Sequence, residues 1–163
     1  MKKHGLLPVV GQNARILILG SLPGDESLRR QEYYGNPRNR FWAVMGGVLG
    51  EDAPESYPEK VKYLKKHGIA LWDVISAADR EGSLDSNIRN MEFNDIAGLL
   101  SANPTIEVIA LNGNKAIGSF NKYLRRHPST AGLRICRLPS TSAMSVCAGW
   151  NLENLIEQWL EIL

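Results

Sequence analysis

The chain has 163 residues, of which 44% are hydrophobic and 22% are charged. This length fits a single domain over residues 1–163, and the apolar content is ordinary for a packed core, which excludes a wholly disordered chain. Nineteen Lys and Arg residues against 17 Asp and Glu residues give a formal net charge of +2. This balance excludes a strongly basic protein that coats nucleic acid, although it is compatible with a local basic surface.

The cysteine and histidine content argues against a metal centre. The chain has 2 cysteines, Cys136 and Cys147, too few for a four-cysteine zinc site or a cysteine-ligated iron–sulfur cluster. Its histidines are His4, His67 and His127, far apart in the sequence. No segment resembles a secretory signal or approaches the ~20 apolar residues of a membrane span. We therefore expect a soluble, cytoplasmic protein with no membrane association.

Short apolar runs alternate with segments of helical period. Strands are predicted for residues 14–20, 69–75, 106–112 and, more weakly, 133–139. Helices are predicted after Pro37, between the N-cap Ser56 and Gly68, and in residues 94–103, 114–127 and 151–163. The order β-α-α-β-α-β-α-β-α is typical of an α/β fold with a short, mostly parallel four-stranded sheet covered by helices on both faces.

The connection after the first strand, residues 20–42, is long enough to suggest a functional loop. It matches neither GxGxxG nor GxxxxGK[ST], so we expect no nucleotide cofactor. Tyrosines alternate here with arginines, a pairing that suits single-base recognition because rings stack on bases while guanidinium groups bind phosphates. The residues concerned are Arg29, Arg30, Tyr33, Tyr34, Arg38, Arg40 and Phe41. The alternative is that Phe41 and Trp42 pack in the core and the arginines are solvated; for Tyr34, stacking and packing both remain open.

Polar residues also follow the second and fourth predicted strands. Asp73 ends a buried strand, where a carboxylate is costly unless it has partners. It either caps the next loop or accepts a hydrogen bond from a ring N–H such as that of hypoxanthine or uracil. Residues 138–145, LPSTSAMS, are rich in small hydroxyl side chains that suit phosphate oxygens, although an ordinary turn before the last helix explains them equally well.

The order of these segments carries a family resemblance. GSLPG (20–24), YYGNPRNRFW (33–42), IALWDVI (69–75), LNGNKA (111–116) and LPSTSA (138–143) follow one another at a specific spacing. The chain from about residue 8 to its last helix resembles the uracil-DNA glycosylase superfamily. The layout is most similar to the hypoxanthine-DNA (deoxyinosine) glycosylases and the mismatch-specific uracil/thymine-DNA glycosylases.

The resemblance implies a three-layer α/β/α sandwich that hydrolyses the N-glycosidic bond of a damaged base in DNA without a metal or organic cofactor. It implies that the flipped base is bound by Ser21, Leu22, Pro23, Gly24, Tyr34 and Asp73. It implies DNA contacts at Arg38, Asn114, Lys115, Pro139, Ser140, Thr141, Ser142 and Met144, with Ala143 and Met144 near the residues that fill the vacated stack.

One position distinguishes the branches of the family. The uracil and thymine mismatch glycosylases carry an Asn at the third residue of the first loop, where this chain has Leu22. Hypoxanthine glycosylases similarly have an apolar residue there and place their catalytic Asn in the PRN segment, which Asn39 matches. The resemblance therefore implies that Asn39 is catalytic and that hypoxanthine is the favoured base.

Three alternatives remain open at this point. The base is uracil or an alkylated purine instead of hypoxanthine, or the chain is a non-catalytic module that binds damaged DNA or a nucleobase. A small-molecule enzyme on a doubly wound fold is the third alternative. We expect a monomer, because no heptad pattern or large apolar helix face is left over. We expect few phosphate contacts, because the net charge is close to zero and Glu153, Glu157 and Glu161 lie along one face of the predicted last helix, which should point away from DNA.

Overall fold

The computed structural model describes residues 2–163, apart from the side chain of Ala131. Its centre is a 4-stranded sheet with the order β3-β2-β6-β7, in which all neighbouring strands are parallel. The strands are β2 (Ile16–Gly20), β3 (Ile69–Asp73), β6 (Val108–Asn112) and β7 (Arg134–Leu138). Each lies within a segment predicted as a strand, so the α/β class and the short, mostly parallel sheet are confirmed.

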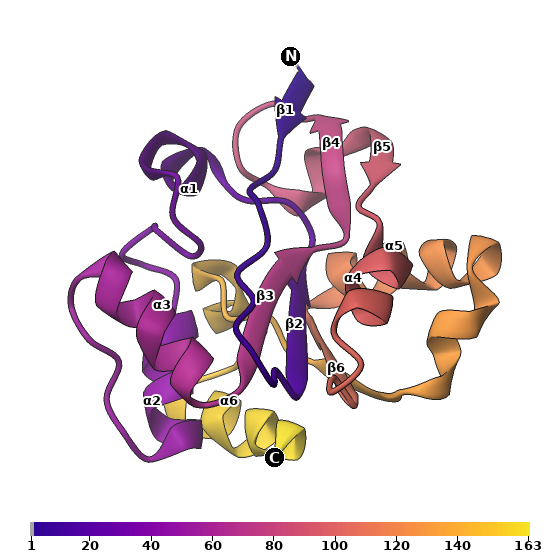
Figure 1. Ribbon diagram of the computed structural model, residues 1–163. Coiled ribbons are helices and arrows are strands. Elements are labelled where there is room, and N and C mark those ends of the chain that lie inside the picture. Colours follow the sequence, from indigo (N-terminus) through magenta and orange to yellow (C-terminus); the bar gives the residue numbers. More distant parts are fainter. Residues whose placement is uncertain (1) are drawn as a thin grey trace.

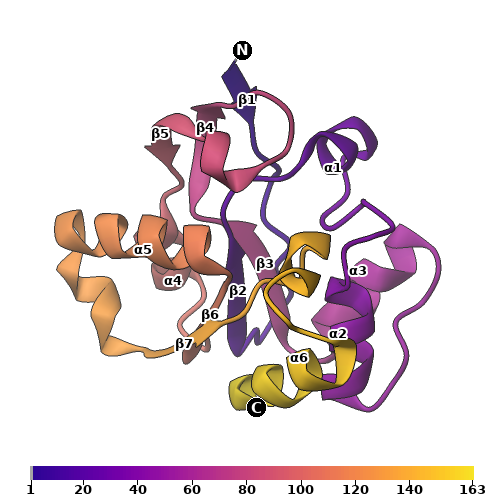
Figure 2. The same ribbon diagram turned by 180° about the vertical axis from the view of Figure 1, so that it is seen from behind.

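Helices cover both faces of this sheet, as Figures 1 and 2 show from opposite sides. Side chains alternate along a strand, so Ile16 and Ile18 enter one apolar core while Leu17 and Leu19 enter the other. The first core is closed by α2 (Phe41–Leu49), α3 (Tyr57–Lys66) and α6 (Leu152–Trp159). The second is closed by α4 (Ile96–Ala102) and α5 (Asn114–Arg126).

The local sequence explains how two of these helices begin and pack. Ser56 caps α3 as predicted, since its side chain accepts a hydrogen bond from the backbone N–H of Glu59 at 3.3 Å. Helix α2 continues through Gly46 and Gly47, although glycine disfavours the helical conformation. A Cβ at position 47 would lie 2.4 Å from Cδ1 of Ile156. The missing side chain therefore lets α6 pack closely on α2.

A second sheet is absent from the sequence prediction. It is 3-stranded and antiparallel, with the order β1-β4-β5, and lies beyond the end of β3 (Figure 1). Its strands are β1 (Lys2–His4), β4 (Ile75–Asp79) and β5 (Arg89–Phe93). We expected a loop here because β5 is largely exposed and lacks an alternating apolar pattern. Only Val74 separates β3 from β4, so the predicted strand 69–75 contains all of β3 and the first residue of β4.

The remaining elements are short. Helix α1 (Asp25–Arg30) lies inside the connection that we expected to be irregular. The 3₁₀ segments are η1 (Asp85–Asn87), η2 (Pro128–Gly132), η3 (Ala143–Val146) and η4 (Leu160–Ile162). Among the helices of residues 2–163, none combines the length and the apolar character needed to cross a membrane.

Candidate active site

A cavity of about 520 Å³ opens at the carboxyl ends of the parallel strands. This volume lies within the roughly 300–1,000 Å³ typical of small-molecule sites. Its walls come from residues within segments 20–27, 33–39, 83–86 and 140–144, together with Asp73 and Asn112. Parallel sheets bind ligands at this edge because the loops that follow all their strands meet there.

Most of the predicted site residues line this cavity. They are Ser21, Leu22, Pro23, Gly24, Tyr34, Arg38, Asn39, Asp73, Ser140, Thr141, Ser142 and Met144. Three predicted DNA contacts lie outside its lining: Asn114, Lys115 and Pro139. Asn114 and Lys115 begin helix α5. The carbonyl oxygen of Pro139 accepts a hydrogen bond from Nε1 of the buried Trp159 at 3.0 Å, so this residue fixes the C-terminal helix.

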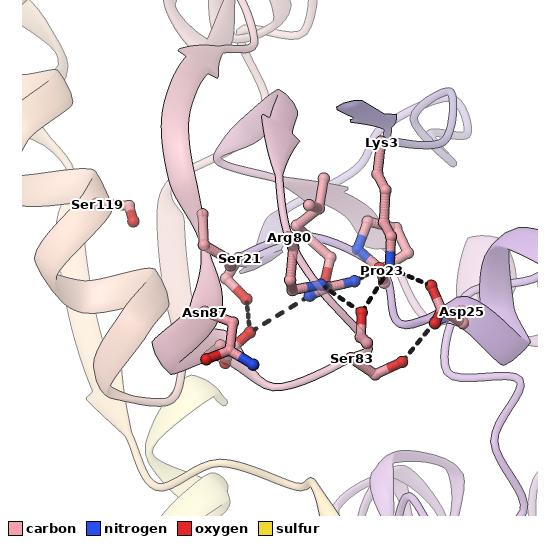
Figure 3. A network of polar contacts seen from close by, with 12 residues as sticks. Lys3, Ser21, Pro23, Asp25, Arg80, Ser83, Asn87 and Ser119 are labelled. Atoms are coloured by element: carbon pink, nitrogen blue, oxygen red, sulfur yellow. Dashed lines mark hydrogen bonds and ion pairs between the residues drawn. The ribbon is translucent and has the colours of Figure 1, made fainter. Parts of the chain in front are cut away.

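The loop that follows β2, residues 21–24, is held in place by Arg80, a buried residue that sequence reasoning did not single out (Figure 3). Its guanidinium group donates to the carbonyl oxygens of Leu22, at 3.4 Å, and of Pro23. Its Nε donates to the carbonyl oxygen of Gly82 at 3.1 Å. A buried cation that satisfies several carbonyl oxygens fixes the backbone around them. Leu22 therefore has a rigid backbone in the cavity wall.

The same network reaches the chain's N-terminal strand (Figure 3). Nζ of Lys3 donates to Oδ1 of Asp25 and to the carbonyl oxygen of Gly82, both at 2.5 Å. The backbone N–H of Asp25 donates to Oγ of Ser83 at 2.9 Å. The connection between β4 and β5 thus forms one wall of the cavity, and β1 of the small antiparallel sheet supports it from outside through Lys3.

Asp73 lies at the cavity floor and is 5% exposed. Its Oδ2 atom is buried and has no hydrogen-bond partner among the described residues. Burial, reinforced by the negative charge of Asp85 and opposed by the positive charge of Arg80, raises the pKa of Asp73 to about 7. The carboxyl group is therefore largely protonated just below neutral pH, a state that the sequence left open.

Gly20 makes room for this carboxyl group. A Cβ at position 20 would lie 2.5 Å from Oδ1 of Asp73 and 3.2 Å from the hydroxyl oxygen of Tyr34. The missing side chain of Gly20 is thus needed to admit two neighbouring side chains of the protein itself. Any larger residue would displace the floor of the cavity.

Asn39 is held in one orientation by two hydrogen bonds to its side-chain oxygen. Oδ1 accepts from the backbone N–H of Phe41 at 2.9 Å and from Oγ1 of Thr141 at 2.8 Å. A backbone N–H can only donate, so the amide oxygen must face Phe41, and both of its lone pairs are used. Asn39 therefore offers the cavity its N–H donors, and a water molecule or base that it binds must accept from them.

Asn112 continues the network across the cavity. Its Nδ2 donates to Oγ1 of Thr141 at 3.1 Å and to the hydroxyl oxygen of Tyr34 at 3.2 Å. Its Oδ1 accepts from the backbone N–H of Thr141 at 3.0 Å. Thr141 is fully buried, so these bonds form without competition from water. They connect the ends of β6 and β7 to the segment that carries Asn39.

Tyr34 packs against the first core and also lines the cavity, so packing is confirmed and stacking on a base stays a prediction. Its backbone has a positive φ of 53°, an uncommon conformation outside glycine. One face of its ring stacks on Phe41, with centroids 4.0 Å apart and an interplanar angle of 16°. The residue also lines the cavity. Phe41 and Trp42 pack in or against the first core, as the alternative interpretation expected.

The arginines of the connection after β2 do not act as one basic surface. Arg29 and Arg30 both pair with Glu26 on α1. The guanidinium group of Arg40 donates to the carbonyl oxygen of Trp150 at 2.7 Å and to Oγ of Ser145. Only Arg38 of the four lines the cavity. Phosphate binding by these arginines stays a prediction, and the three outside the cavity lining already pair with acidic, hydroxyl or carbonyl groups of the protein.

Sequence reasoning missed part of the site. Asp85, Ser83, Leu84 and Ser86 line the cavity, yet they lie in a polar stretch with the pattern of an ordinary loop. Asn112 ends a buried apolar strand as Asp73 does, so the same rule would have found it. In residues 2–163 no three His, Cys, Asp or Glu side chains cluster in a way that would hold a metal ion.

Comparison with known proteins identifies the family. The model of the uracil DNA glycosylase superfamily matches residues 7–163. The chain belongs to this superfamily. It is similar to the hypoxanthine DNA glycosylase of Methanosarcina acetivorans, with 48% identity over 126 residues that span 77% of this chain and 79% of the relative. The hypoxanthine DNA glycosylase of Methanosarcina barkeri is 43% identical over 126 residues, with the same shares covered, 77% and 79%.

A solved structure shows the same fold. It is the solution NMR structure of a Methanosarcina acetivorans protein assigned as a uracil DNA glycosylase, with a TM-score of 0.81, 43% identity and 99% of each chain covered. The predicted family and fold class are confirmed. The predicted activity, that of a DNA glycosylase acting on DNA, agrees with the superfamily and with the names of the curated relatives.

Proposed function

We propose that this protein is a monomeric, single-domain glycosylase of the cytoplasm that hydrolyses the N-glycosidic bond of deoxyinosine in DNA and releases hypoxanthine. The proposal includes no metal or organic cofactor. The observation that carries it is the buried carboxyl group of Asp73, without a hydrogen-bond partner among the described residues and with a pKa raised to about 7. The names of the two Methanosarcina relatives support the choice of base.

A protonated Asp73 suits a lactam base that leaves as an anion. When the glycosidic bond breaks, positive charge develops on the sugar and negative charge on the base. In hypoxanthine the carbonyl oxygen shares that negative charge, and the O–H of a neutral carboxyl group stabilises it by donating a hydrogen bond. Adenine has no such oxygen. An ionised Asp73 would instead repel the leaving base, so the reaction requires the protonated form.

Asn39 supplies further hydrogen-bond donors for the cleavage of the glycosidic bond. Its amide oxygen is occupied by Phe41 and Thr141, so its N–H groups are the atoms available to a ligand in the cavity. They can hold the oxygen of the attacking water or donate to the base. A neutral amide with its oxygen occupied cannot accept a proton from that water. Asn39 therefore orients and stabilises, and the proton acceptor must be another group.

The mouth of the cavity suits a base that has left the duplex. A base inside a helix is inaccessible, so the nucleotide must be extruded at a cost of a few kcal/mol, which is lowest for a mispaired base such as inosine. Met144 and Leu84 line the cavity and are 60% and 49% exposed. Exposed apolar side chains of this kind fill the space left between stacked bases. Arg38 and the hydroxyl groups of Ser140 and Ser142 are available to phosphates beside them.

A single-turnover excision assay tests this proposal. The purified protein is incubated with duplexes that carry one inosine, one uracil, one alkylated purine or only normal bases, and alkali then cleaves any abasic site. We expect cleavage of the inosine duplex at a rate at least about 10-fold above that of the others, which corresponds to about 1.4 kcal/mol of discrimination.

The alternatives give distinct outcomes in this assay. Preferential cleavage of the uracil duplex would replace hypoxanthine by uracil as the substrate. Binding of the inosine duplex without cleavage would contradict the glycosylase activity and indicate a binding module. Cleavage of free deoxyinosine as fast as that of the duplex would indicate a small-molecule hydrolase.

A further inference from the structure

A second carboxylate lies in the cavity at a different depth from Asp73. Asp85, in η1, lines the cavity, and its side chain is 50% exposed, whereas Asp73 at the floor is 5% exposed. A flipped nucleotide enters base first, so its base reaches the floor while its sugar stays nearer the mouth. Asp73 is therefore placed toward the base and Asp85 toward the sugar.

The contacts of Asp85 favour its charged form. Oγ of Ser21 donates to its Oδ1 at 2.8 Å, and Nη1 of Arg80 lies 3.8 Å from the same oxygen. Burial is the largest influence and raises the pKa of Asp85 above its ordinary value, while the Ser21 hydrogen bond and the positive charges of Arg80 and Lys115 oppose that rise. The Ser21 and Arg80 contacts within the described part of the chain are made to Oδ1, which leaves Oδ2 available to a ligand.

Asp73 has the opposite surroundings. Its neighbours in the site are the hydroxyl groups of Tyr33 and Tyr34, the carboxylate of Asp85 and the guanidinium group of Arg80. Within the described part of the chain, none of them donates a hydrogen bond to the buried Oδ2 of Asp73. Two neighbouring carboxyl groups cannot both ionise cheaply, so the group with donors ionises first and the other keeps its proton.

We propose that Asp85 is a catalytic residue of the glycosylase reaction: its carboxylate stabilises the positively charged sugar and accepts a proton from the attacking water. This inference rests on the proposed function. It supplies the acceptor that Asn39 lacks, because the amide oxygen of Asn39 already accepts from Phe41 and Thr141.

Each bond and proton in this step has a defined origin and destination. The bond between C1′ and the base breaks, and its electron pair leaves with the base, which receives a proton from Asp73. The water oxygen bonds to C1′, and the proton that it loses passes to Oδ2 of Asp85. The products are hypoxanthine and an abasic sugar. Exchange with solvent then moves the proton from Asp85 and returns one to Asp73.

Excision kinetics with Asp85→Asn test the proposal. The amide keeps an oxygen for Ser21 but loses the charge and the proton acceptor, so we expect the single-turnover rate on an inosine duplex to fall about 100-fold. Removing the charge of Asp85 also lowers the pKa of Asp73. Because the reaction needs protonated Asp73, the pH above which the excision rate falls should then be lower than in the wild type. Asp85→Glu, which restores the charge, should recover part of the rate. Glu81→Gln removes an exposed charge from the same connection, outside the cavity lining, and should retain the wild-type rate and pH profile.

The failure of this inference is distinct from failure of the proposed function. If the wild-type protein releases hypoxanthine but the rate of Asp85→Asn stays within about threefold of the wild-type rate, Asp85 is not catalytic.

If the wild-type protein releases no hypoxanthine, the proposed function fails, and NMR of the free protein still tests which of the two carboxyl groups ionises first. Titration of the ¹³C-labelled aspartate carboxyl groups should show Asp85 ionising at lower pH than Asp73. The reverse order would overturn the proposal, and so would an Asp73 titration that Asp85→Asn leaves unchanged. This readout on the wild-type protein also holds if the Asn variant does not fold.

Discussion

The two walls of the cavity are built from different chemistry. One wall joins Asn39, Thr141, Asn112 and Tyr34 through hydrogen bonds between neutral groups. The other wall carries Asp85, and it meets Asp73 at the cavity floor and the buried Arg80, which lies outside the lining. We call these three residues the charged wall, because their charges act on one another's pKa. The neutral wall is fixed whatever the pH, whereas the charged wall changes its protonation near neutrality. Geometry and proton supply are thus assigned to separate parts of the site, and variants on the two walls should differ in their pH dependence.

The largest effect is expected on the neutral wall. Asn39→Ala removes preorganised donors from the cavity, so we expect the single-turnover rate of hypoxanthine release to fall about 10²–10³-fold. The pH profile should keep its shape, because no titrating group is lost. Asn121→Ala, at an exposed position of α5, is the matched control and should retain the wild-type rate. A profile that changes shape in Asn39→Ala would break the division between the walls.

On the charged wall, Asp73→Asn should change the pH dependence itself. The wild-type rate is expected to fall as pH rises through about 7, because the protonated carboxyl group is lost. The amide still donates but cannot transfer a proton, so we expect a rate about 10-fold lower at pH 6 and no fall from this group above neutrality.

The same variant has a consequence for stability. The folded-state pKa of Asp73 lies above that of an exposed carboxyl group, so the folded state holds the proton more tightly. The free energy of unfolding therefore decreases from about pH 4 to about pH 7 and the loss persists above that range. Asp73→Asn should abolish this decrease and be more stable than the wild type at pH 8 by a few kcal/mol in urea denaturation. Asp79→Asn, at the end of β4, should leave the decrease in place.

A smaller effect is expected for Thr141, which orients Asn39 in the neutral wall. Thr141→Val keeps the shape of the side chain but removes its hydroxyl group. Oδ1 of Asn39 then loses one hydrogen-bond donor, and Nδ2 of Asn112 loses one acceptor. We expect a loss of about 1–3 kcal/mol in stability and about a 10-fold lower excision rate. Thr130→Val removes a hydroxyl group that binds the carbonyl oxygen of His127, away from the cavity. It should lower stability without lowering the rate, and an equal rate loss in both variants would show that Thr141 acts only through stability.

The smallest effect concerns salt. Arg38 lines the cavity and the charge of Lys115 acts on Asp85, whereas Arg29 and Arg30 are paired with Glu26 and Arg40 donates to the carbonyl oxygen of Trp150. We expect the logarithm of the DNA association constant to fall with the logarithm of salt concentration with a slope of about −2 to −4. Lys115→Ala should reduce this slope by about 1, whereas Lys122→Ala, farther along α5, should not. A slope near about −8 would indicate a much larger footprint than the cavity rim.

The parallel sheet was predictable because its two central strands, β2 and β6, are buried on both faces. The run ILILG of β2 and the run VIALN of β6 leave no residue exposed, so composition alone distinguishes them from the helices. Residues that follow such strands, among them Ser21 and Asp73, could therefore be assigned to the site from the sequence alone. The family resemblance added Asn39 as the catalytic residue.

The charged wall was harder to predict because its members depend on tertiary contacts. Strand β5 is mostly exposed and has the composition of a polar loop, so its pairing with β4 has no periodic pattern to reveal it. Arg80 and Asp85 are ordinary charged residues in such a loop, and only the fold brings them to Ser21, Leu22 and Pro23. The orientation of Asn39 was equally hidden, since its fixing partner Thr141 lies 102 residues farther along the chain.

That separation has a consequence for folding. The side chain that points donors into the cavity lies in the first quarter of the chain, but the hydroxyl group that orients it follows β7. The backbone N–H of Arg40 also donates to the carbonyl oxygen of Thr141, at 2.9 Å. Both contacts need the segment after β7 to be docked against the segment that carries Asn39. Excision activity should therefore appear in refolding only once that segment has docked, and would serve as a reporter of C-terminal docking.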